Sequence, residues 1–480
     1  MAGVTPLVEH SATELAALIA ARELSGVEVV TAHLEQIERL DPHVNAIPVR
    51  RDPERVLAEA RALDDGPVRG PLHGLPVAVK DLAEVAGLPW SAGSPVHRDR
   101  VGAVDALHVR RMREAGAVVV GKTNTPEFGF GSQTYNPVHG TTRNPYDPSR
   151  TPGGSSGGAA AALALRMLPV ADGSDYGGSL RNPAGFCNVL GLRPSRGLVP
   201  SAGFVAQLGE VGPMARTVDD LALLLDVLAG PDRSAPLGRP VPEPPLPDVR
   251  GARIAWVGDW GGRLPTEPGL LELCRGAADV LTDLGATVEE HVPDVDLEEL
   301  WRTFLTWRWW GAVEMLPLLE TSRALLKPEV VWEIEHAAAL TARDVHAALV
   351  ARDAWYAVVV DLFDRYDAVL APSAQVFPFD AAVAWPAEID GRAMDTYHRW
   401  MQTVTPWSLA AVPVLGMPAG FDARGLPAGV QLIGPPGGDR TVLHLGRAHE
   451  AATGWVRRVR PPLLDVTPAG PPGTPPRPGR

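Results

Sequence analysis

The chain has 480 residues, of which 45% are hydrophobic and 21% charged, a balance typical of a globular protein with a large core. Its formal net charge of −13 disfavours binding to nucleic acid or to an anionic membrane, because both need a basic face. Two cysteines are too few for a disulfide framework, and the 13 histidines form no metal-binding motif, so we expect neither a metal nor a cofactor.

Helical and extended patterns alternate along the chain. Ser11 and Ser25, each followed three positions later by a glutamate, are capping residues that open two helices. A third helix begins at Pro53, because proline suits the first helical turn. Further helices are predicted at 105–114, 159–168, 217–228 and 269–284, and strands at 75–79, 117–121, 169–171, 253–257 and 367–372. This alternation predicts an α/β fold in which helices cover the faces of a sheet.

Three segments depart from that alternation. Residues 231–249 are dense in proline and suit a long surface loop. Residues 297–366 form a mostly helical insert that is rich in tryptophan. Residues 461–480 are rich in proline and glycine, and we expect this tail to be disordered. The first residues lack a basic-then-apolar leader, and the chain lacks an apolar run of about 18 residues, so we expect a cytoplasmic protein.

The stretch 151–196 carries the strongest chemical signal. It contains two clusters of glycine and serine, at 153–158 and 177–179. The first precedes an alanine-rich helix, so its serines lie at a helix N-terminus, where the dipole favours developing negative charge. The second contains successive glycines that let backbone N–H groups converge on one point, as an oxyanion hole requires.

A base for these serines is available upstream. Lys80 ends the apolar run 75–79, and burial lowers the pKa of a lysine until it can accept a proton from a hydroxyl. We therefore predict that Lys80, Ser155 and Ser179 meet in a hydrolytic site. An esterase elbow at 153–157 is disfavoured because turn residues precede it, and a phosphate-binding loop is disfavoured because no Gly-Lys-Ser/Thr follows the glycines.

Several motifs in order resemble the amidase signature family of serine hydrolases. They are residues 77–81, 121–127, 153–158, 174–181, 183–194 and 425–434. The resemblance covers roughly residues 11–455 and implies one large α/β/α domain over residues 1–460, with a mixed central sheet covered by helices on both faces. Its catalytic part would lie at about 60–230.

Residue by residue, the resemblance implies a Ser–cisSer–Lys triad. Ser179 would be the nucleophile, Lys80 the base, and Ser155 the proton relay that is entered through a cis peptide bond. The oxyanion hole would be the backbone N–H groups of Tyr176, Gly177, Gly178 and Ser179. The residues that orient this network would be Ser156, Asp175 and Arg181.

The implied activity is hydrolysis of small carboxamides. We expect aryl or bulky apolar amides, anilides or carbamates, with Trp90, Trp407 and the helical insert walling the pocket, although core packing explains most tryptophans. Esterase or urethanase side activity is compatible with the same site. The expected partner is a small-molecule amide alone, and the chain would act as a monomer or homodimer.

Two alternatives remain. The glutaminase subunit of an aminoacyl-tRNA amidotransferase shares the family motifs and the approximate length. A catalytically inactive scaffold with the same fold belongs to a different functional class, and such a scaffold would be expected to have lost one of the three triad residues. All three are present in this chain.

Overall fold

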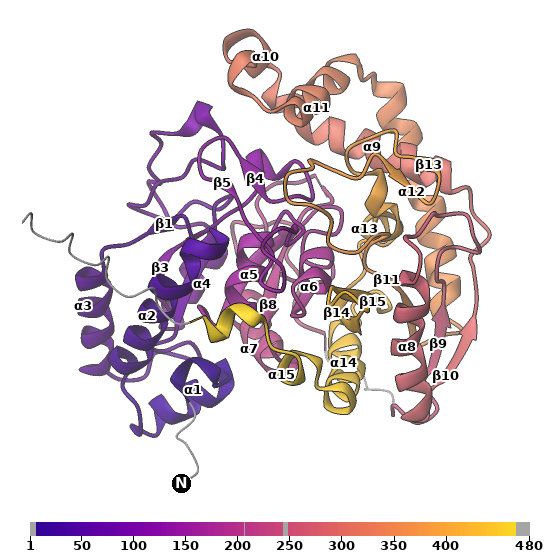
Figure 1. The fold of residues 1–480 in the computed structure, drawn as a ribbon. Helices are drawn as coiled ribbons and strands as arrows, with labels where there is room; N and C mark the ends of the chain where they lie inside the picture. The colour runs from indigo at the N-terminus through magenta and orange to yellow at the C-terminus, as the bar shows by residue number, and fades with distance from the viewer. Residues whose placement is uncertain (1–5, 206, 243–247, 467–480) are drawn as a thin grey trace, which may run out of the picture.

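A computed structural model describes residues 6–205, 207–242 and 248–466, and it contains one large mixed sheet and a smaller one (Figure 1). The large sheet has eight strands in the order β10-β9-β11-β15-β14-β7-β8-β6, parallel from β10 to β11 and antiparallel from β11 to β6. Its strands are β6 (Val170–Asp175), β7 (Leu190–Arg193), β8 (Glu210–Ala215), β9 (Arg253–Trp256), β10 (Thr287–Glu290), β11 (Ala368–Pro372), β14 (Val414–Phe421) and β15 (Pro427–Ile433).

The smaller sheet has the order β1-β3-β2, and its strand β2 lies beside β6 of the large sheet. Its strands are β1 (Val49–Arg50), β2 (Pro76–Lys80) and β3 (Val118–Thr123). Two hairpins pair β4 (Tyr135–Asn136) with β5 (Gly140–Thr141) and β12 (Glu388–Ile389) with β13 (Arg392–Ala393).

Helices flank the large sheet, which gives a single α/β domain (Figure 1). They are α1 (Ala12–Ala20), α2 (Gly26–Val44), α3 (Pro53–Asp64), α4 (Leu107–Glu114), α5 (Gly157–Ala164), α6 (Asn182–Phe186), α7 (Val218–Leu228), α8 (Leu270–Asp283), α9 (Leu297–Ala312), α10 (Pro317–Thr321), α11 (Pro328–Ala339), α12 (Ala342–Phe363), α13 (Thr405–Ala410), α14 (Asp439–Thr453) and α15 (Trp455–Arg458). The predicted capping boxes at Ser11 and Ser25 open α1 and α2.

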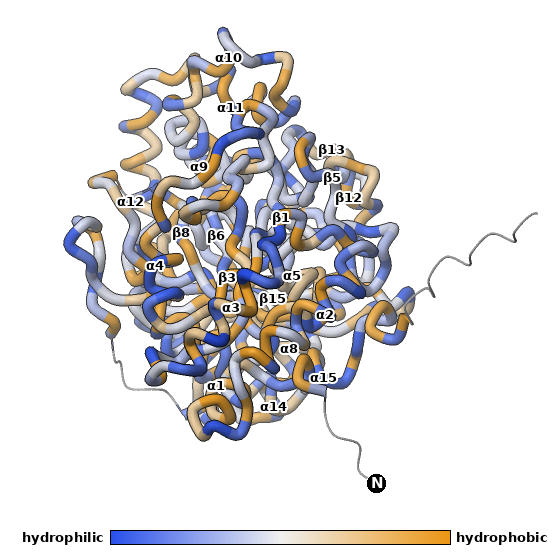
Figure 2. Tube along the Cα trace, turned by 90° about the vertical axis from the view of Figure 1, so that its left-hand side faces the viewer, coloured by the Kyte–Doolittle hydropathy of each residue, from blue (hydrophilic) through white to orange (hydrophobic). Residues whose placement is uncertain are grey.

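The central strands of the large sheet, such as β11 and β14, are buried on both faces, and their successive side chains enter different cores. Leu370 and Leu415 pack with α7, α8 and α14, whereas their neighbours Val369 and Val414 pack with α9, α12 and α13. This is the alternation that a strand between two helical layers requires. The helices on the outside of the molecule also alternate: hydrophobic and hydrophilic segments follow one another along them (Figure 2).

The helical insert predicted at 297–366 comprises α9 to α12, which project at one end of the molecule (Figure 1). The tail predicted to be disordered from residue 461 begins instead with a 3-10 helix, Pro462–Asp465. Arg39 donates hydrogen bonds to the carbonyl groups of Leu464 and Val466, which hold this segment against α2. Residues 467–480 lie outside the described residues. None of the helices in the described ranges combines the length and apolar composition that a bilayer crossing requires.

Candidate active site

Lys80 is the last residue of β2 and is 1% exposed. Its backbone N–H donates to the Asp172 carboxylate at 3.0 Å, which ties the end of β2 to β6. The side chain Nζ lies 2.8 Å from Ser155 Oγ, 2.8 Å from Ser156 Oγ and 3.0 Å from Ser174 Oγ. Three hydroxyls from two separate segments therefore surround one buried amine.

Burial lowers the pKa of Lys80 to about 7, although Asp172 and Asp175 act in the opposite direction. Desolvation disfavours a charged amine, and neutral hydroxyl groups compensate only part of that loss. The lowered pKa favours the uncharged amine, whose lone pair is free to accept a proton.

The first glycine–serine cluster places Ser155 and Ser156 directly before α5. The peptide bond between Gly154 and Ser155 is cis, and Ser156 is the residue that precedes the first helical turn. Glycine is required at position 158, because a Cβ there would lie 2.4 Å from the backbone N of Asn124. All eight residues of α5 are buried, so the two serines precede a helix that is enclosed by the core.

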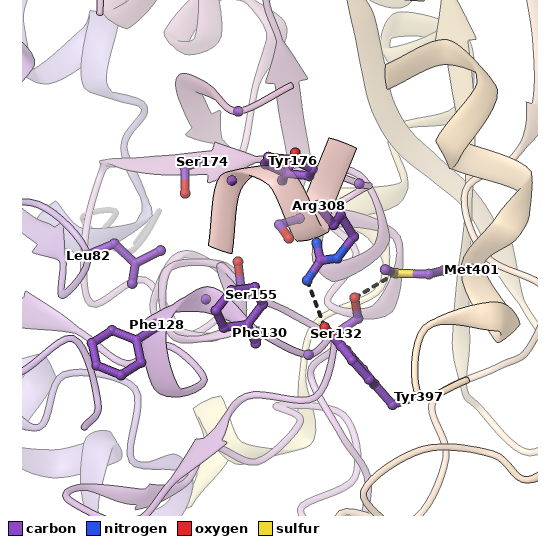
Figure 3. A pocket seen from close by; sticks show the side chains of 16 residues that line it. Leu82, Phe128, Phe130, Ser132, Ser155, Ser174, Tyr176, Arg308, Tyr397 and Met401 are labelled. Atoms are coloured by element: carbon purple, nitrogen blue, oxygen red, sulfur yellow. Dashed lines mark hydrogen bonds between the residues drawn. The ribbon is translucent and has the colours of Figure 1, made fainter. Parts of the chain in front are cut away.

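Ser155 and Ser179 line the same cavity, which has a volume of about 210 Å³ (Figure 3). We call it the serine cavity. Its lining residues are Leu82, Phe128, Gly129, Phe130, Gly131, Ser132, Ser155, Ser174, Tyr176, Gly177, Ser179, Gly209, Arg308, Gly311, Tyr397 and Met401. Apart from the serines, most of the wall is apolar or aromatic, with one cationic side chain.

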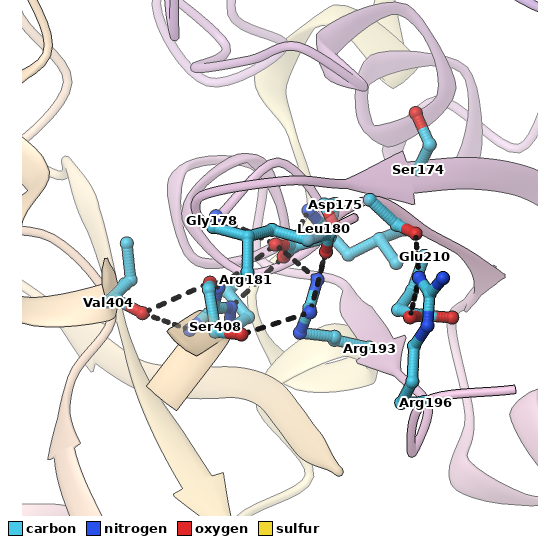
Figure 4. A network of polar contacts seen from close by, with 12 residues as sticks. Ser174, Asp175, Gly178, Leu180, Arg181, Arg193, Arg196, Glu210, Val404 and Ser408 are labelled. Atoms are coloured by element: carbon cyan, nitrogen blue, oxygen red, sulfur yellow. Dashed lines mark hydrogen bonds and ion pairs between the residues drawn. The ribbon is translucent and has the colours of Figure 1, made fainter. Parts of the chain in front are cut away.

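The loop from Asp175 to Arg181 is held by a buried ionic network (Figure 4). The Asp175 carboxylate accepts hydrogen bonds from the N–H groups of Gly178 at 2.8 Å and Leu180 at 3.0 Å, and it pairs with Arg181. Burial alone would raise the pKa of Asp175, but Arg181 and Arg193 lower it well below its usual range. The carboxylate therefore stays ionised and shapes the loop that carries Ser179.

This network changes the predicted oxyanion hole. The Gly178 N–H points to the Asp175 carboxylate, so it is engaged within the protein, contrary to the expectation that it faces the substrate. Among the described residues, the N–H groups of Tyr176, Gly177 and Ser179 have no internal acceptor. Gly178 has φ of +105°, and a Cβ there would lie 2.6 Å from Val404 Cγ2, so its role is to turn the loop.

The predicted pocket tryptophans lie elsewhere. Trp90 lines a separate cavity of about 340 Å³ together with Lys80, His108 and Asp172. Trp407 is fully buried and packs against Trp260 and Trp355 with ring centroids 5.7 Å away in each case. Neither tryptophan is among the residues that line the serine cavity.

Several residues that line the serine cavity were not singled out from the sequence. Phe128 and Phe130 lie within three residues of the end of the motif 121–127, and this proximity was the available signal. Arg308 comes from the helical insert and Met401 from a 3-10 helix, and no local pattern marked either of them. Within the described ranges, no three His, Cys, Asp or Glu side chains gather in a way that could hold a metal ion.

A buried amine beside serine hydroxyls at the edge of a cavity is the arrangement of a serine hydrolase in which lysine replaces histidine. The comparisons with known proteins agree with this class. A family model described as Amidase matches residues 28–443. An acylamidase of Rhodococcus erythropolis is 34% identical over 461 residues, covering 93% of this chain and 96% of that protein.

Two further relatives are similar over nearly the whole chain. A glutamyl-tRNA(Gln) amidotransferase subunit of Thermus thermophilus is 37% identical over 479 residues, covering 92% of this chain and 97% of that protein. A crystal structure of a bacterial aryl acylamidase of the amidase signature family superposes with a TM-score of 0.88 at 30% identity, covering 98% of this chain and all of that one. The chain therefore belongs to the amidase signature family and is a hydrolase that acts on amides.

Proposed function

We propose that this chain hydrolyses aryl or bulky apolar amides, anilides or carbamates through an acyl-enzyme on Ser179. One observation carries the proposal. The buried Lys80 amine lies 2.8 Å from Ser155 Oγ, and Ser155 lines the same cavity as Ser179. The proposal takes Lys80 as the base, Ser155 as the relay hydroxyl and Ser179 as the nucleophile, and the two contacts support that order.

In the proposed mechanism, Ser179 Oγ attacks the amide carbonyl while its proton passes to Ser155, whose own proton passes to neutral Lys80. The carbonyl π electrons move to oxygen, and the N–H groups of Tyr176, Gly177 and Ser179 receive that oxyanion. Removing one such donor typically costs about 10²–10³ in rate. The C–N bond then breaks as the lysinium proton returns through Ser155 to the leaving amine. Water next attacks the acyl-enzyme while its proton passes through Ser155 to Lys80, and that proton returns through Ser155 to Ser179 Oγ as the bond between the acyl group and Ser179 breaks.

The surrounding residues would position this relay. Ser156 and Ser174 lie within hydrogen-bond distance of the Lys80 amine and would direct its lone pair toward Ser155. Asp175 and Arg181 would keep the Ser179 loop in one conformation. Asp172 holds the backbone of Lys80, which sets the position of the base.

The composition of the wall supports the aryl substrate class. Leu82, Phe128, Phe130 and Met401 offer flat or flexible apolar contacts of the kind that bind aromatic rings. The similarity to an acylamidase and to an aryl acylamidase points in the same direction.

The second candidate is the glutaminase subunit of an amidotransferase. It is favoured by the 37% identity to the Thermus thermophilus protein over nearly the whole chain. A glutaminase must recognise free glutamine, a small amino acid whose α-ammonium and α-carboxylate groups make it zwitterionic, which the apolar part of the serine cavity does not favour. Ammonia release from free glutamine that depends on a copurifying partner would support this candidate over the first.

A hydrolysis screen tests the proposal. Purified protein is offered amides, anilides, carbamates, esters and glutamine, with Ser179→Ala as the control. We expect turnover of anilides by the wild type alone, and covalent labelling of Ser179 by a fluorophosphonate. A folded wild type that neither labels nor hydrolyses any of these compounds would favour the inactive scaffold.

We also propose that residues 1–460 act as one domain with its catalytic part at about 60–230, in the cytoplasm, as a monomer or homodimer. Light scattering after size exclusion measures the oligomeric state. A stable complex with other subunits in the native extract would contradict this part and point to the amidotransferase.

A further inference from the structure

Arg308 of α9 is the one cationic side chain among the described residues that line the serine cavity. It is 7% exposed, and two of its three guanidinium nitrogens are engaged. Nε donates to Glu333 at 2.7 Å, and Nη2 donates to the hydroxyl of Tyr397 at 2.7 Å. In the described part of the chain, Nη1 has no hydrogen-bond acceptor. Figure 3 shows the guanidinium at the cavity, between Tyr176 and Tyr397.

The guanidinium is held rigidly in this place. Its carbon lies 5.2 Å from the ring centroid of Phe130 and 5.3 Å from that of Tyr176, distances at which a cation is attracted to an aromatic face. Burial by itself disfavours the charge, but Glu333 raises the pKa of Arg308 above its usual value. Arg308 is therefore a permanent donor whose direction is fixed before any substrate enters.

The chemistry of the matching acceptor follows from the neighbours of Arg308. Glu333 already balances the charge of the guanidinium, and the Tyr397 hydroxyl donates to the same Glu333 oxygen. An ionised carboxylate on the substrate would lose its hydration and gain no uncompensated cation in return. A neutral carbonyl oxygen loses far less on burial and still accepts a strong hydrogen bond from a charged donor.

We propose that Arg308 Nη1 donates a hydrogen bond to a second, neutral carbonyl oxygen of the substrate, away from the bond that is cleaved. The preferred substrates are then amides with an apolar body and one further ketone, amide or ester carbonyl. This inference rests on the proposed function, because it takes the serine cavity as the substrate site.

The experiment compares matched substrates that differ in one oxygen. In one series the acyl chain of a 4-nitroanilide carries a ketone at carbon 4, 5 or 6, and each partner carries a methylidene group in its place. In a second series, 4-acetylacetanilide is compared with 4-isopropenylacetanilide. We expect the wild type to favour the ketone in at least one pair by about 10- to 100-fold in kcat/KM, the effect of one hydrogen bond from a charged donor.

The variant Arg308→Met should remove that preference, mainly through a higher KM for the ketone. In the second series the two leaving anilines differ electronically, but this difference is the same in wild type and variant. It therefore cancels when the ketone-to-methylidene ratios of kcat/KM are compared between wild type and variant. Because Arg308→Met leaves Glu333 buried without its cation, the double variant Arg308→Met/Glu333→Gln is measured as well. Circular dichroism checks that each variant is folded.

Arg399→Met is the matched control, since Arg399 stacks on Trp301 and does not line the serine cavity. It should keep the ketone preference. The inference is overturned if the ratio of kcat/KM for the ketone to kcat/KM for its methylidene partner is the same in the wild type and in both Arg308 variants. It is also overturned if the enzyme prefers a 4-carboxyanilide over the ketone and that preference depends on Arg308. Neither of these two outcomes contradicts the proposed function if the wild type hydrolyses the methylidene partners and Ser179→Ala does not. No hydrolysis in any pair rejects both.

Discussion

Two regions of the chain meet at the serine cavity, and they differ in how they are built. The first region is the catalytic one, which includes Lys80 and the segment from residue 151 to Arg181. Every residue from 151 to 173 is buried, and the polar groups around Lys80 and Asp175 form hydrogen bonds within this region. In the helical insert, by contrast, the 22-residue α12 buries Ala348, Trp355, Val359 and Leu362, and much of its surface faces solvent. In the first region a substitution would disturb buried packing and hydrogen bonds. The second region is more exposed and supplies part of the wall of the serine cavity. This division separates the chemistry from the choice of substrate.

The largest effect is expected from the first region. Ser179→Ala and Lys80→Met should each lower kcat/KM for an anilide by about 10⁴-fold or more, because one step needs both groups. The double variant should be no worse than the single ones. Strictly additive losses, measured in free energy from kcat/KM, would show that the two residues do not act together.

The stability of the two regions should differ in the same way. Asp175→Asn removes the charge that Arg181 and Arg193 share, and leaving two buried cations without it should cost about 3–5 kcal/mol in the free energy of unfolding. Glu298→Gln, in α9 of the insert, removes an exposed partner of Arg399 and should cost less than about 1 kcal/mol. Urea unfolding monitored by tryptophan fluorescence measures both, and similar losses would contradict the contrast.

The main pH dependence of catalysis should arise from the first region. Lys80 must be uncharged to act as a base, so with a pKa of about 7 the rate should rise about tenfold from pH 6 to pH 8 and then level off. Near the cavity wall, burial keeps the pKa of His398 well below its usual value, and Arg308 stays charged, so neither titrates in this range. A flat or falling kcat/KM profile between pH 6 and pH 8 would exclude Lys80 as the base.

The smallest effect concerns the cavity wall. Phe130→Ala should reduce the preference for an aryl amide over acetamide by about tenfold, because it removes one aromatic contact in the serine cavity. Trp260→Phe, which alters a fully buried ring outside that cavity, should lower stability and leave the preference unchanged. If both variants shifted the preference equally, the assignment of the wall would be wrong.

Much of the fold could be read from local patterns. The capping boxes at Ser11 and Ser25, the strand that ends at Lys80 and the helix after residue 217 all occur as predicted, because each depends on neighbouring residues. Strand β6 was predicted over residues 169–171 but runs from Val170 to Asp175, since its second half gains order by pairing with β8. A short stretch of sequence does not indicate which distant strand it will pair with, so the full length of β6 could not be predicted locally.

By itself, the sequence determined the ingredients of the site: the two glycine–serine clusters, the lysine at the end of an apolar strand, and the alternation of helices and strands. Glycine spacing and apolar periodicity are local properties, so they can be read without a structure. Only the tertiary structure decided which groups meet. It brings Ser174 to the lysine, turns the Gly178 N–H toward Asp175, buries Trp407 away from the cavity and carries Arg308 from the insert to the serine cavity. These outcomes depend on packing between segments far apart in the chain, where burial and neighbouring charge set both the geometry and the pKa of each group.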